Sequence, residues 1–157
     1  MPGFVHTQPD LPWRSTVPTM PATMIFDGDC VLCSGTVQFV LRHERDETMS
    51  FATTQSAAGR ELAERNGVSV ADLDLTFVLV EDGQVWRRSD AAVRVARHLA
   101  TPWRWLAVLR LVPRPLRDLA YSAIARRRYR LFGRREACFL PAPSQRRRFL
   151  PDRPPDA

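Results

Sequence analysis

Residues 24–33 constrain the fold of this chain more than any other part of its sequence. The stretch starts as a short apolar run, breaks at Gly28 between two acids, and then places two cysteines three residues apart. After Cys33 the apolar residues recur at helical spacing, beginning with Val37. The pattern therefore predicts a strand, a tight turn and a helix, with Cys30 at the helix N-terminus and Cys33 one turn further in.

The predicted position of Cys30 favours a thiolate over a thiol. The first turn of a helix has N–H groups without intrahelical partners and carries a partial positive charge. A free thiol with a pKa of about 8.5 is only a few per cent ionised at neutral pH, and a helix N-terminus lowers that pKa. Cys33 shares a helix face with Cys30 and can close a disulfide with it. We therefore predict a redox dithiol in which a solvent-exposed Cys30 attacks and the deeper Cys33 resolves the mixed disulfide.

Asp27 and Asp29 flank the turn, and their chemistry allows several interpretations. Beside a dithiol, two carboxylates oppose thiolate formation, and one of them can move a proton to or from Cys33. An equally good interpretation is that they cap the turn and the helix. An apolar run followed by D-x-D also resembles the first motif of haloacid-dehalogenase-type phosphatases. That resemblance implies a cation, usually lysine, and the chain contains no lysine.

The main alternative from another class is a non-enzymatic zinc-binding or protein-interaction module. A structural zinc ion takes four ligands, often from two paired motifs. Besides the dithiol, the sequence offers Cys138, His43 and His98 as ligands, and it has no second CxxC. We therefore expect neither a metal nor a cofactor. Cys138 is interpreted as a buried packing thiol, with a role as a third redox partner left open.

Prolines and hydrophobic periodicity divide the chain into three parts. Five of the 13 prolines lie at or before Pro21 and the next is Pro102, so residues 1–21 are expected to form a flexible leader. Residues 22–140 form one domain, and residues 141–157 are expected to be a flexible tail rich in proline and arginine. The predicted strands cover residues 23–27, 49–53, 75–81 and 84–88, and the predicted helices cover 30–44, 56–66, a stretch from Ser89 onward, 103–112 and 113–131.

This order of elements predicts an α/β fold, a thioredoxin-like mixed sheet with flanking helices and a C-terminal helical extension. Ser89 is expected to cap a helix whose inner side carries Ala92, Val93, Ala96 and Leu99. The apolar cluster around Trp103 and Trp105 is expected to cover the sheet or to pack the added helices together. Binding of a membrane surface or a partner is the alternative for that cluster.

Four stretches of the chain resemble the DCC family, a thioredoxin-like group of thiol–disulfide oxidoreductases also described as a domain of unknown function. They are I-F-D-G-D-C-V-L-C, V-L-V-E-D-G with Ser89-Asp90-Ala91, P-R-P-L-R-D with Tyr121, and R-Y-R-L-F-G with Cys138 and Pro141. The resemblance implies thiol–disulfide exchange at Cys30 and Cys33 with a disulfide-containing protein or a small thiol. Supporting residues would be Asp27, Asp29, Ser89 and Asp90, although helix capping explains the last two as well. Residues 71–76 lack the cis-proline of thioredoxin-like enzymes, so their peptide-docking edge is not expected here.

Charge and hydropathy restrict the remaining function classes. The net charge is +6, and all 23 basic residues are arginine. Clusters at residues 126–128, 134–135 and 146–148 are interpreted as a solvated helix face and tail, with weak contact to a membrane surface or another anion as the alternative. No motif for specific nucleic-acid recognition is present. No apolar run approaches the ~18 residues of a membrane span, and the first residues lack a secretory pattern, so we expect a soluble, cytoplasmic protein.

Overall fold

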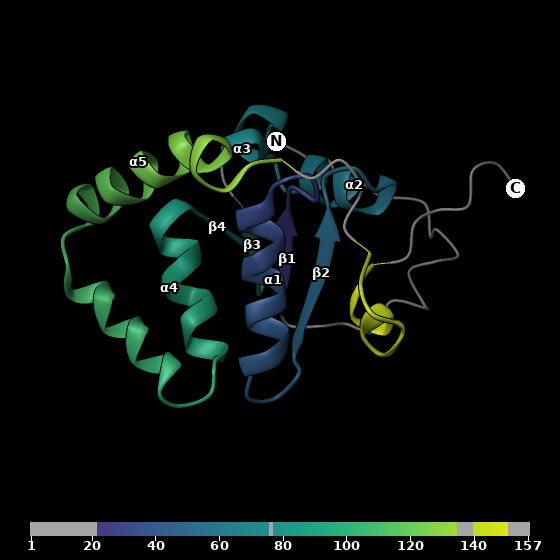
Figure 1. Cartoon of the computed structure of the whole chain (residues 1–157), viewed down its shortest axis with the longest axis horizontal. Helices are drawn as coiled ribbons and strands as arrows, with labels where there is room; N and C mark the ends of the chain where they lie inside the picture. The colour runs from purple at the N-terminus through teal and green to yellow at the C-terminus, as the bar shows by residue number, and fades with distance from the viewer. Residues whose placement is uncertain (1–21, 76, 135–139, 151–157) are drawn as a thin grey trace, which may run out of the picture.

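The computed structural model describes residues 22–75, 77–134 and 140–150, which form a four-stranded sheet with helices on both faces (Figure 1). The predicted leader and Cys138 lie outside these described residues. The strand order is β2-β1-β3-β4, in which β2 is parallel to β1, and β3 is antiparallel to both β1 and β4. The strands are β1 (Ala22–Phe26), β2 (Met49–Thr53), β3 (Val78–Glu81) and β4 (Gln84–Arg87).

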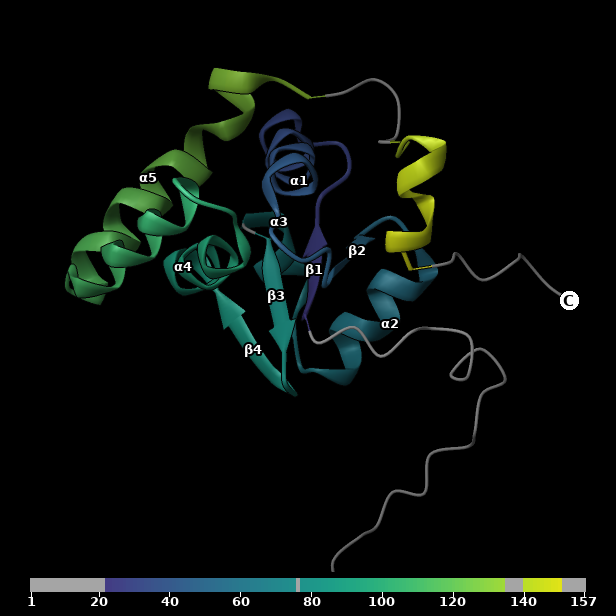
Figure 2. The ribbon, with the colours of Figure 1, turned by 90° about the horizontal axis from the view of Figure 1, so that it is seen from below.

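The central strand β1 is covered on both faces, which explains why it reads as a continuous apolar run. Met24 and Phe26 lie in the larger core with residues of α1 and α4, whereas Ile25 lies in a smaller core with residues of α2 and α3. Figure 2 shows α1 and α2 on opposite sides of the sheet. These helices are α1 (Val31–His43), α2 (Ala57–Arg65), α3 (Val70–Leu75) and α4 (Arg88–His98). The prediction of a thioredoxin-like mixed sheet with flanking helices is confirmed.

The first half of the domain follows the predicted elements closely. The strand expected at residues 49–53 has those bounds, and Ser56 caps α2 by accepting a hydrogen bond from the N–H of Gly59 at 2.9 Å. The strand expected at 75–81 starts only at Val78, because α3 occupies the preceding residues. Ser69 favours that short helix, since its hydroxyl oxygen accepts a hydrogen bond from the N–H of Asp72.

The predicted cap of α4 is wrong. The N-cap is Arg87, with no side-chain cap hydrogen bond, and Ser89 lies inside the first turn. The hydroxyl of Ser89 instead donates to Asp118, a partner 29 residues away that no local pattern indicates. Because the return strand β4 is shorter than expected, the helix starts earlier and its buried face also shifts. Of the four predicted inner residues Ala96 and Leu99 are buried, but Ala91 and Val95 replace Ala92 and Val93.

The C-terminal extension consists of the 3₁₀ helix η1 (Trp103–Leu111) and the long helix α5 (Arg114–Phe132). Pro115 lies in the first turn of α5, where a missing N–H costs nothing. Figure 1 shows this extension on the α4 side of the domain, with α5 leading back toward the start of α1. No residue of η1 is fully buried, but Trp103 packs against Phe39 of α1 with ring centroids 4.9 Å apart. The expectation that the apolar cluster packs the domain is therefore met by Trp103, whereas Trp105 and Leu111 are exposed. None of the described helices is both long and apolar enough to cross a bilayer.

The structure describes part of the segment that its composition predicts to be a flexible tail. Its described part, residues 141–150, contains the 3₁₀ helix η2 (Pro143–Arg148). Arg148 is 5% exposed, and the N–H of Leu150 donates to the carbonyl of Phe51 in β2 at 2.9 Å. Phe149 packs against Phe51 with ring centroids 5.5 Å apart. These contacts attach residues 148–150 to the edge strand of the sheet.

Candidate active site

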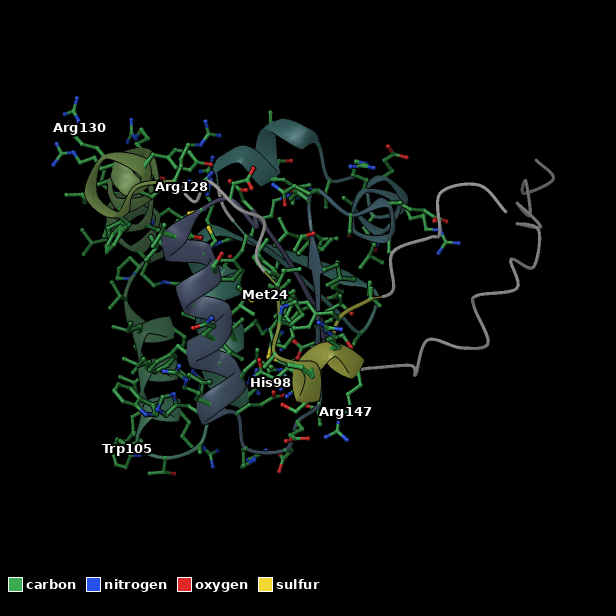
Figure 3. The ribbon with its side chains drawn as sticks, turned by 45° about the vertical axis from the view of Figure 1, so that its right-hand side comes forward. Met24, His98, Trp105, Arg128, Arg130 and Arg147 are labelled. Carbon is green, nitrogen blue, oxygen red and sulfur yellow. The ribbon has the colours of Figure 1, made fainter. Side chains whose placement is uncertain are left out.

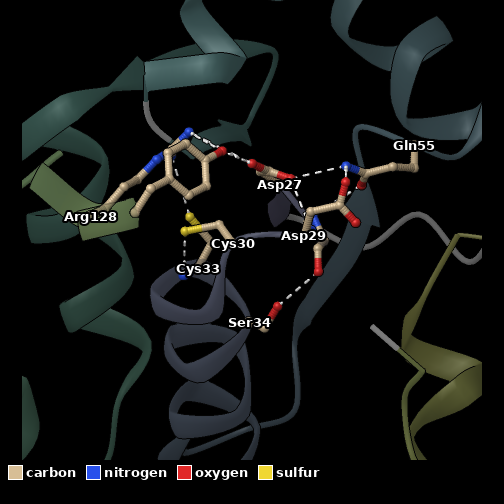
Figure 4. Close-up of polar contacts among 9 residues, drawn as sticks. Asp27, Asp29, Cys30, Cys33, Ser34, Gln55 and Arg128 are labelled. Carbon is tan, nitrogen blue, oxygen red and sulfur yellow. Dashed lines mark hydrogen bonds and ion pairs between the residues drawn. The ribbon is translucent and has the colours of Figure 1, made fainter. Parts of the chain in front are cut away.

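The turn between β1 and α1 places Cys30 at the N-cap of the helix. The backbone of Cys30 is extended, with φ −80° and ψ 118°, and its sulfur accepts a hydrogen bond from the N–H of Cys33 at 3.3 Å. A sulfur atom therefore occupies the position in which a serine or aspartate oxygen usually satisfies a free helical N–H. Both cysteines are reduced, and Figure 4 shows them side by side at the end of α1.

The two thiols differ in acidity. A hydrogen bond from the thiol of Cys33, helped by the N–H of Cys33 and the charge of Arg128, lowers the pKa of Cys30 to about 6 against the opposing effect of burial. The same hydrogen bond raises the pKa of Cys33, and burial and the negative charge on Cys30 raise it further. At neutral pH these shifts favour a thiolate at Cys30 and a protonated thiol at Cys33.

Asp27 lies at the end of β1 and is held on both carboxylate oxygens. Oδ1 accepts hydrogen bonds from the N–H of Asp29 at 2.9 Å and from the amide of Gln55 at 3.0 Å, and Oδ2 accepts one from the hydroxyl of Tyr129. Burial alone would raise the pKa of Asp27, but the hydrogen bonds from Tyr129 and Gln55 outweigh it, and the pKa is lowered. Asp27 is thus an ionised carboxylate that is 7% exposed.

Gln55, which the sequence analysis did not single out, fixes the shape of the turn. Its carbonyl oxygen accepts from the N–H of Gly28 at 3.0 Å, and its amide also lies 3.4 Å from Asp29. A Cβ at Gly28 would lie 2.9 Å from that carbonyl oxygen, closer than real contacts allow. On the other side of the turn, the hydroxyl of Ser34 donates to the carbonyl of Gly28 at 3.2 Å (Figure 4). Asp29 therefore contributes to the turn and has no direct contact with the sulfur atoms among the described interactions.

Helix α5 supplies two further residues that the sequence analysis did not assign to the site. Nη1 of Arg128 donates to the sulfur of Cys33 at 3.6 Å, and Nη2 lies 3.7 Å from Oδ2 of Asp27 and 3.0 Å from the hydroxyl of Tyr129. Arg128 is only 2% exposed, so the interpretation of residues 126–128 as a solvated cluster is wrong for this arginine. The available signal was the R-Y-R-L-F-G stretch of the family resemblance, which begins with Arg128.

The end of α5 also covers the dithiol. The backbone of Arg134 pairs with Cys30 in an isolated antiparallel bridge, and its guanidinium lies 4.5 Å from the ring centre of Tyr129. Gly133 makes this turn possible, because its φ of 78° is unfavourable for other residues. Cys30 is 0% and Cys33 is 5% exposed, so the expectation of a solvent-exposed Cys30 is wrong. We call residues 128–134 the cover segment.

Ser89 and Asp90 are not brought to the dithiol. Their described contacts attach α4 to α5: Ser89 donates to Asp118, and Asp90 forms ion pairs with Arg114 and with Arg117, the latter at 3.1 Å. These two residues therefore help to position the helix that carries Arg128. Within residues 22–75, 77–134 and 140–150, no group of three or more His, Cys, Asp or Glu side chains is arranged to hold a metal ion.

Comparison with known proteins identifies the family of this chain. A model of the family described as DCC1-like thiol-disulfide oxidoreductase matches residues 24–134. The chain is 45% identical over 128 residues to the uncharacterized protein YuxK of Bacillus subtilis, covering 82% of this chain and 93% of YuxK. It is 37% identical over 118 residues to the DCC family protein At1g52590, chloroplastic, of Arabidopsis thaliana, covering 74% of this chain and 68% of that protein. No solved structure was found to match. The chain therefore belongs to the DCC1-like thiol–disulfide oxidoreductase family, as the motifs predicted.

Proposed function

We propose that this protein catalyses thiol–disulfide exchange through Cys30 and Cys33, on a disulfide-containing protein or a small disulfide. In the reducing direction the dithiol gives up two electrons and the proton of Cys33, and solvent supplies a second proton: the substrate disulfide becomes two thiols, and Cys30 and Cys33 form a disulfide. The observation that carries the proposal is the geometry of the pair: at the start of α1 the sulfur of Cys30 accepts a hydrogen bond from the N–H of Cys33 at 3.3 Å, and Nη1 of Arg128 lies 3.6 Å from the sulfur of Cys33. The lowered pKa of Cys30 and the raised pKa of Cys33 support it.

In the first step, the thiolate of Cys30 attacks one sulfur of the substrate disulfide. The other sulfur leaves as a thiolate and takes a proton from solvent, and a mixed disulfide joins Cys30 to the substrate. At neutral pH a thiol with a pKa of about 6 is mostly ionised, whereas an ordinary cysteine is not. The acidity of Cys30 therefore makes Cys30, rather than Cys33, the attacking residue.

In the second step, Cys33 gives up its proton and attacks the sulfur of Cys30. A Cys30–Cys33 bond forms, the bond from Cys30 to the substrate breaks, and the released substrate thiolate takes up a proton. Once Cys30 is in a mixed disulfide it carries no negative charge, so it no longer raises the pKa of Cys33 as a hydrogen-bond acceptor and a nearby anion. The guanidinium of Arg128, 3.6 Å from the sulfur of Cys33, then favours its thiolate. Arg128 is thus proposed to stabilise the thiolate of Cys33 once Cys30 has formed the mixed disulfide.

Asp27 is proposed to hold Arg128 and to take part in proton transfer near Cys33. It is ionised, and it contacts Arg128 directly as well as through the hydroxyl of Tyr129. The same contacts tie Asp27 to the neighbours of the dithiol, and the chain contains no lysine to supply the cation that a D-x-D phosphatase usually uses.

Access to the dithiol is proposed to need movement of residues 133–134 at the end of the cover segment, while Arg128 keeps its place. Cys30 has no exposed surface, and a disulfide must approach its sulfur along the S–S axis. The isolated bridge between Cys30 and Arg134 is the contact that we expect to break first.

The reducing cytoplasm suits a catalytic dithiol, and we propose it as the location of this protein. Fractionation of cells that produce the full chain would contradict this proposal if the protein were exported.

The experiment is an assay of disulfide reduction with the full chain, dithiothreitol as the electron source, and oxidised glutathione or insulin as substrate. Cys30→Ser should abolish turnover, while Cys138→Ser, the matched change at the third cysteine, should retain it. The metal content of the same preparation, purified without chelator, distinguishes this proposal from the zinc-binding alternative. Stoichiometric zinc that disappears in Cys30→Ser, with no turnover by the unaltered chain, would contradict the proposal.

A further inference from the structure

The η1–α5 hairpin, residues 103–132, exposes apolar side chains on a scale that the rest of the described chain does not. Among the described residues, every exposed large apolar side chain except Leu140 lies in this hairpin. Trp105 is 72% exposed, Leu111 75% and Leu119 63%. A concentration of exposed apolar side chains in one segment is the kind of surface that marks an interaction site.

The hairpin is also strongly cationic. It contains eight arginines and one acid, Asp118, so its net charge is +7, while the whole chain has +6. Arg114 and Arg117 form ion pairs with Asp90, and Arg128 lies in the dithiol site. The other five arginines have exposed side chains; they are Arg104, Arg110, Arg126, Arg127 and Arg130. The excess positive charge of this protein is therefore concentrated where its apolar surface is.

The inner side of the hairpin is only loosely filled. A cavity of about 540 Å³ lies between α1, α4, η1 and α5, and its lining is almost entirely apolar. Leu106 and Leu109 of η1 line this cavity and are still 46% and 49% exposed. Polar contacts, such as those of Ser89 and Asp90, fasten the hairpin to α4. The apolar residues of the hairpin thus exceed what the domain itself buries.

We propose that the η1–α5 hairpin docks on the surface of an anionic lipid bilayer. Arginine pairs with anionic headgroups, and tryptophan and leucine enter the boundary between headgroups and acyl chains. No described helix is able to cross a bilayer, so the hairpin lies on the surface. Figure 3 shows Arg130 and Trp105 on the hairpin side of the molecule and Arg147 on the other side. This inference does not depend on the dithiol chemistry.

Charge complementarity selects the bilayer over two other occupants. A second copy would bring a net charge of +7 against another +7, which opposes association. A nucleic acid would satisfy the arginines, but its phosphate backbone would leave the tryptophans and leucines exposed. An anionic bilayer satisfies both kinds of side chain, and the cytoplasmic leaflet carries such a charge.

The test is flotation of the full chain with vesicles of phosphatidylcholine alone or of phosphatidylcholine and phosphatidylglycerol in equal parts. Binding is expected with the anionic vesicles only. Leu111→Gln should weaken it by about tenfold, and Arg130→Gln should weaken it by about fivefold. Leu140→Gln and Arg147→Gln are the matched controls outside the hairpin, since Leu140 is 79% exposed and the side chain of Arg147 is 74% exposed. Both controls should bind as the unaltered chain does.

Several results would overturn the proposal. They are no flotation with anionic vesicles, equal flotation with neutral vesicles, and equal loss of binding in hairpin and control variants. A stable dimer in solution that Leu111→Gln dissociates would show that a second copy covers the hairpin. Binding of duplex DNA that competes with the vesicles and is insensitive to Leu111→Gln would assign the arginines to nucleic acid. Disulfide reduction by Leu111→Gln should stay unchanged throughout, so failure of this inference is distinguishable from failure of the proposed activity.

Discussion

Two buried arginines, Arg128 and Arg148, show how the same side chain serves different purposes in two regions of this molecule. Both come from the C-terminal third of the chain, and they are 2% and 5% exposed. Arg148 donates to the carbonyl of Met49 at 3.0 and 2.7 Å and forms an ion pair with Glu44, which in turn accepts from the N–H of Met49. Arg128 instead faces a sulfur atom at 3.6 Å and a carboxylate at 3.7 Å.

The contacts of the two arginines indicate different roles. Arg148, Glu44 and the backbone of Met49 form a set in which charge is matched by charge at short distance, and this set anchors η2 to the sheet. The guanidinium of Arg128 lies between Asp27 and a thiol whose charge changes during exchange. We therefore expect Arg148 to govern stability and Arg128 to govern the ionisation of the cysteines.

Replacement of Arg148 is expected to have the largest effect on stability. Arg148→Met leaves the carboxylate of Glu44, whose side chain is 1% exposed, buried without its cation. The free energy of unfolding should fall by about 3–5 kcal/mol, measured by urea denaturation. Arg147→Met, which removes an exposed ion pair next to it, should cost less than about 1 kcal/mol. An unchanged free energy in Arg148→Met would show that this region does not anchor the tail.

Arg128→Met should have a smaller effect on stability and a clear effect on the cysteines. Asp27 keeps the hydrogen bonds from Tyr129 and Gln55, so we expect a loss of about 1–3 kcal/mol in unfolding free energy. The pKa of Cys30 should rise from about 6, because a positive charge near it is lost. Resolution of a mixed disulfide by Cys33 should slow by about tenfold, followed by mass spectrometry after mixing with oxidised glutathione. Equal resolution rates in Arg128→Met and Arg148→Met would remove the distinction between the two regions.

The smallest effect concerns the cover segment. Gly133→Ala places a Cβ at a φ of 78° and should cost about 1 kcal/mol, weakening the pairing of Arg134 with Cys30. Alkylation of Cys30 by iodoacetamide should therefore become faster. Gly67→Ala, at a φ of 66° and with equally open space, is the matched control. It should lose similar stability and leave the alkylation rate of Cys30 unchanged, whereas faster alkylation in both variants would mean that general loosening exposes the dithiol.

What could be predicted from the sequence is what has a local cause. Ten consecutive residues predict the cysteine pair, the turn and the start of α1. The continuous apolar run of β1 predicts a strand that is buried on both faces. The cap of α2 by Ser56 is equally local. The strand–helix order, and with it the thioredoxin-like fold, could therefore be read from periodicity and turn residues.

What could not be predicted depends on long-range contacts. Arg128 reaches Cys33 across 95 residues, and Tyr129 reaches Asp27 across 102 residues. An arginine in a run of three reads as solvated surface unless its tertiary partner is known, and Ser89 reads as a helix cap for the same reason. The burial of Cys30 likewise comes from a segment that ends at Arg134. Local pattern located the candidate dithiol, while its electrostatic and steric surroundings came from α5.

The most direct test of the central claim is the pH dependence of alkylation of each cysteine in the reduced full chain, with mass spectrometry to separate Cys30, Cys33 and Cys138. A group with a lowered pKa gains its charge at lower pH, so labelling of Cys30 should rise with a midpoint at about 6 and then level off. Labelling of Cys33 should remain slow through neutral pH, because its pKa is raised. Cys33→Ser should also trap glutathione on Cys30, while Cys30→Ser should trap little. Faster labelling of Cys33, together with trapping by Cys30→Ser, would contradict the account.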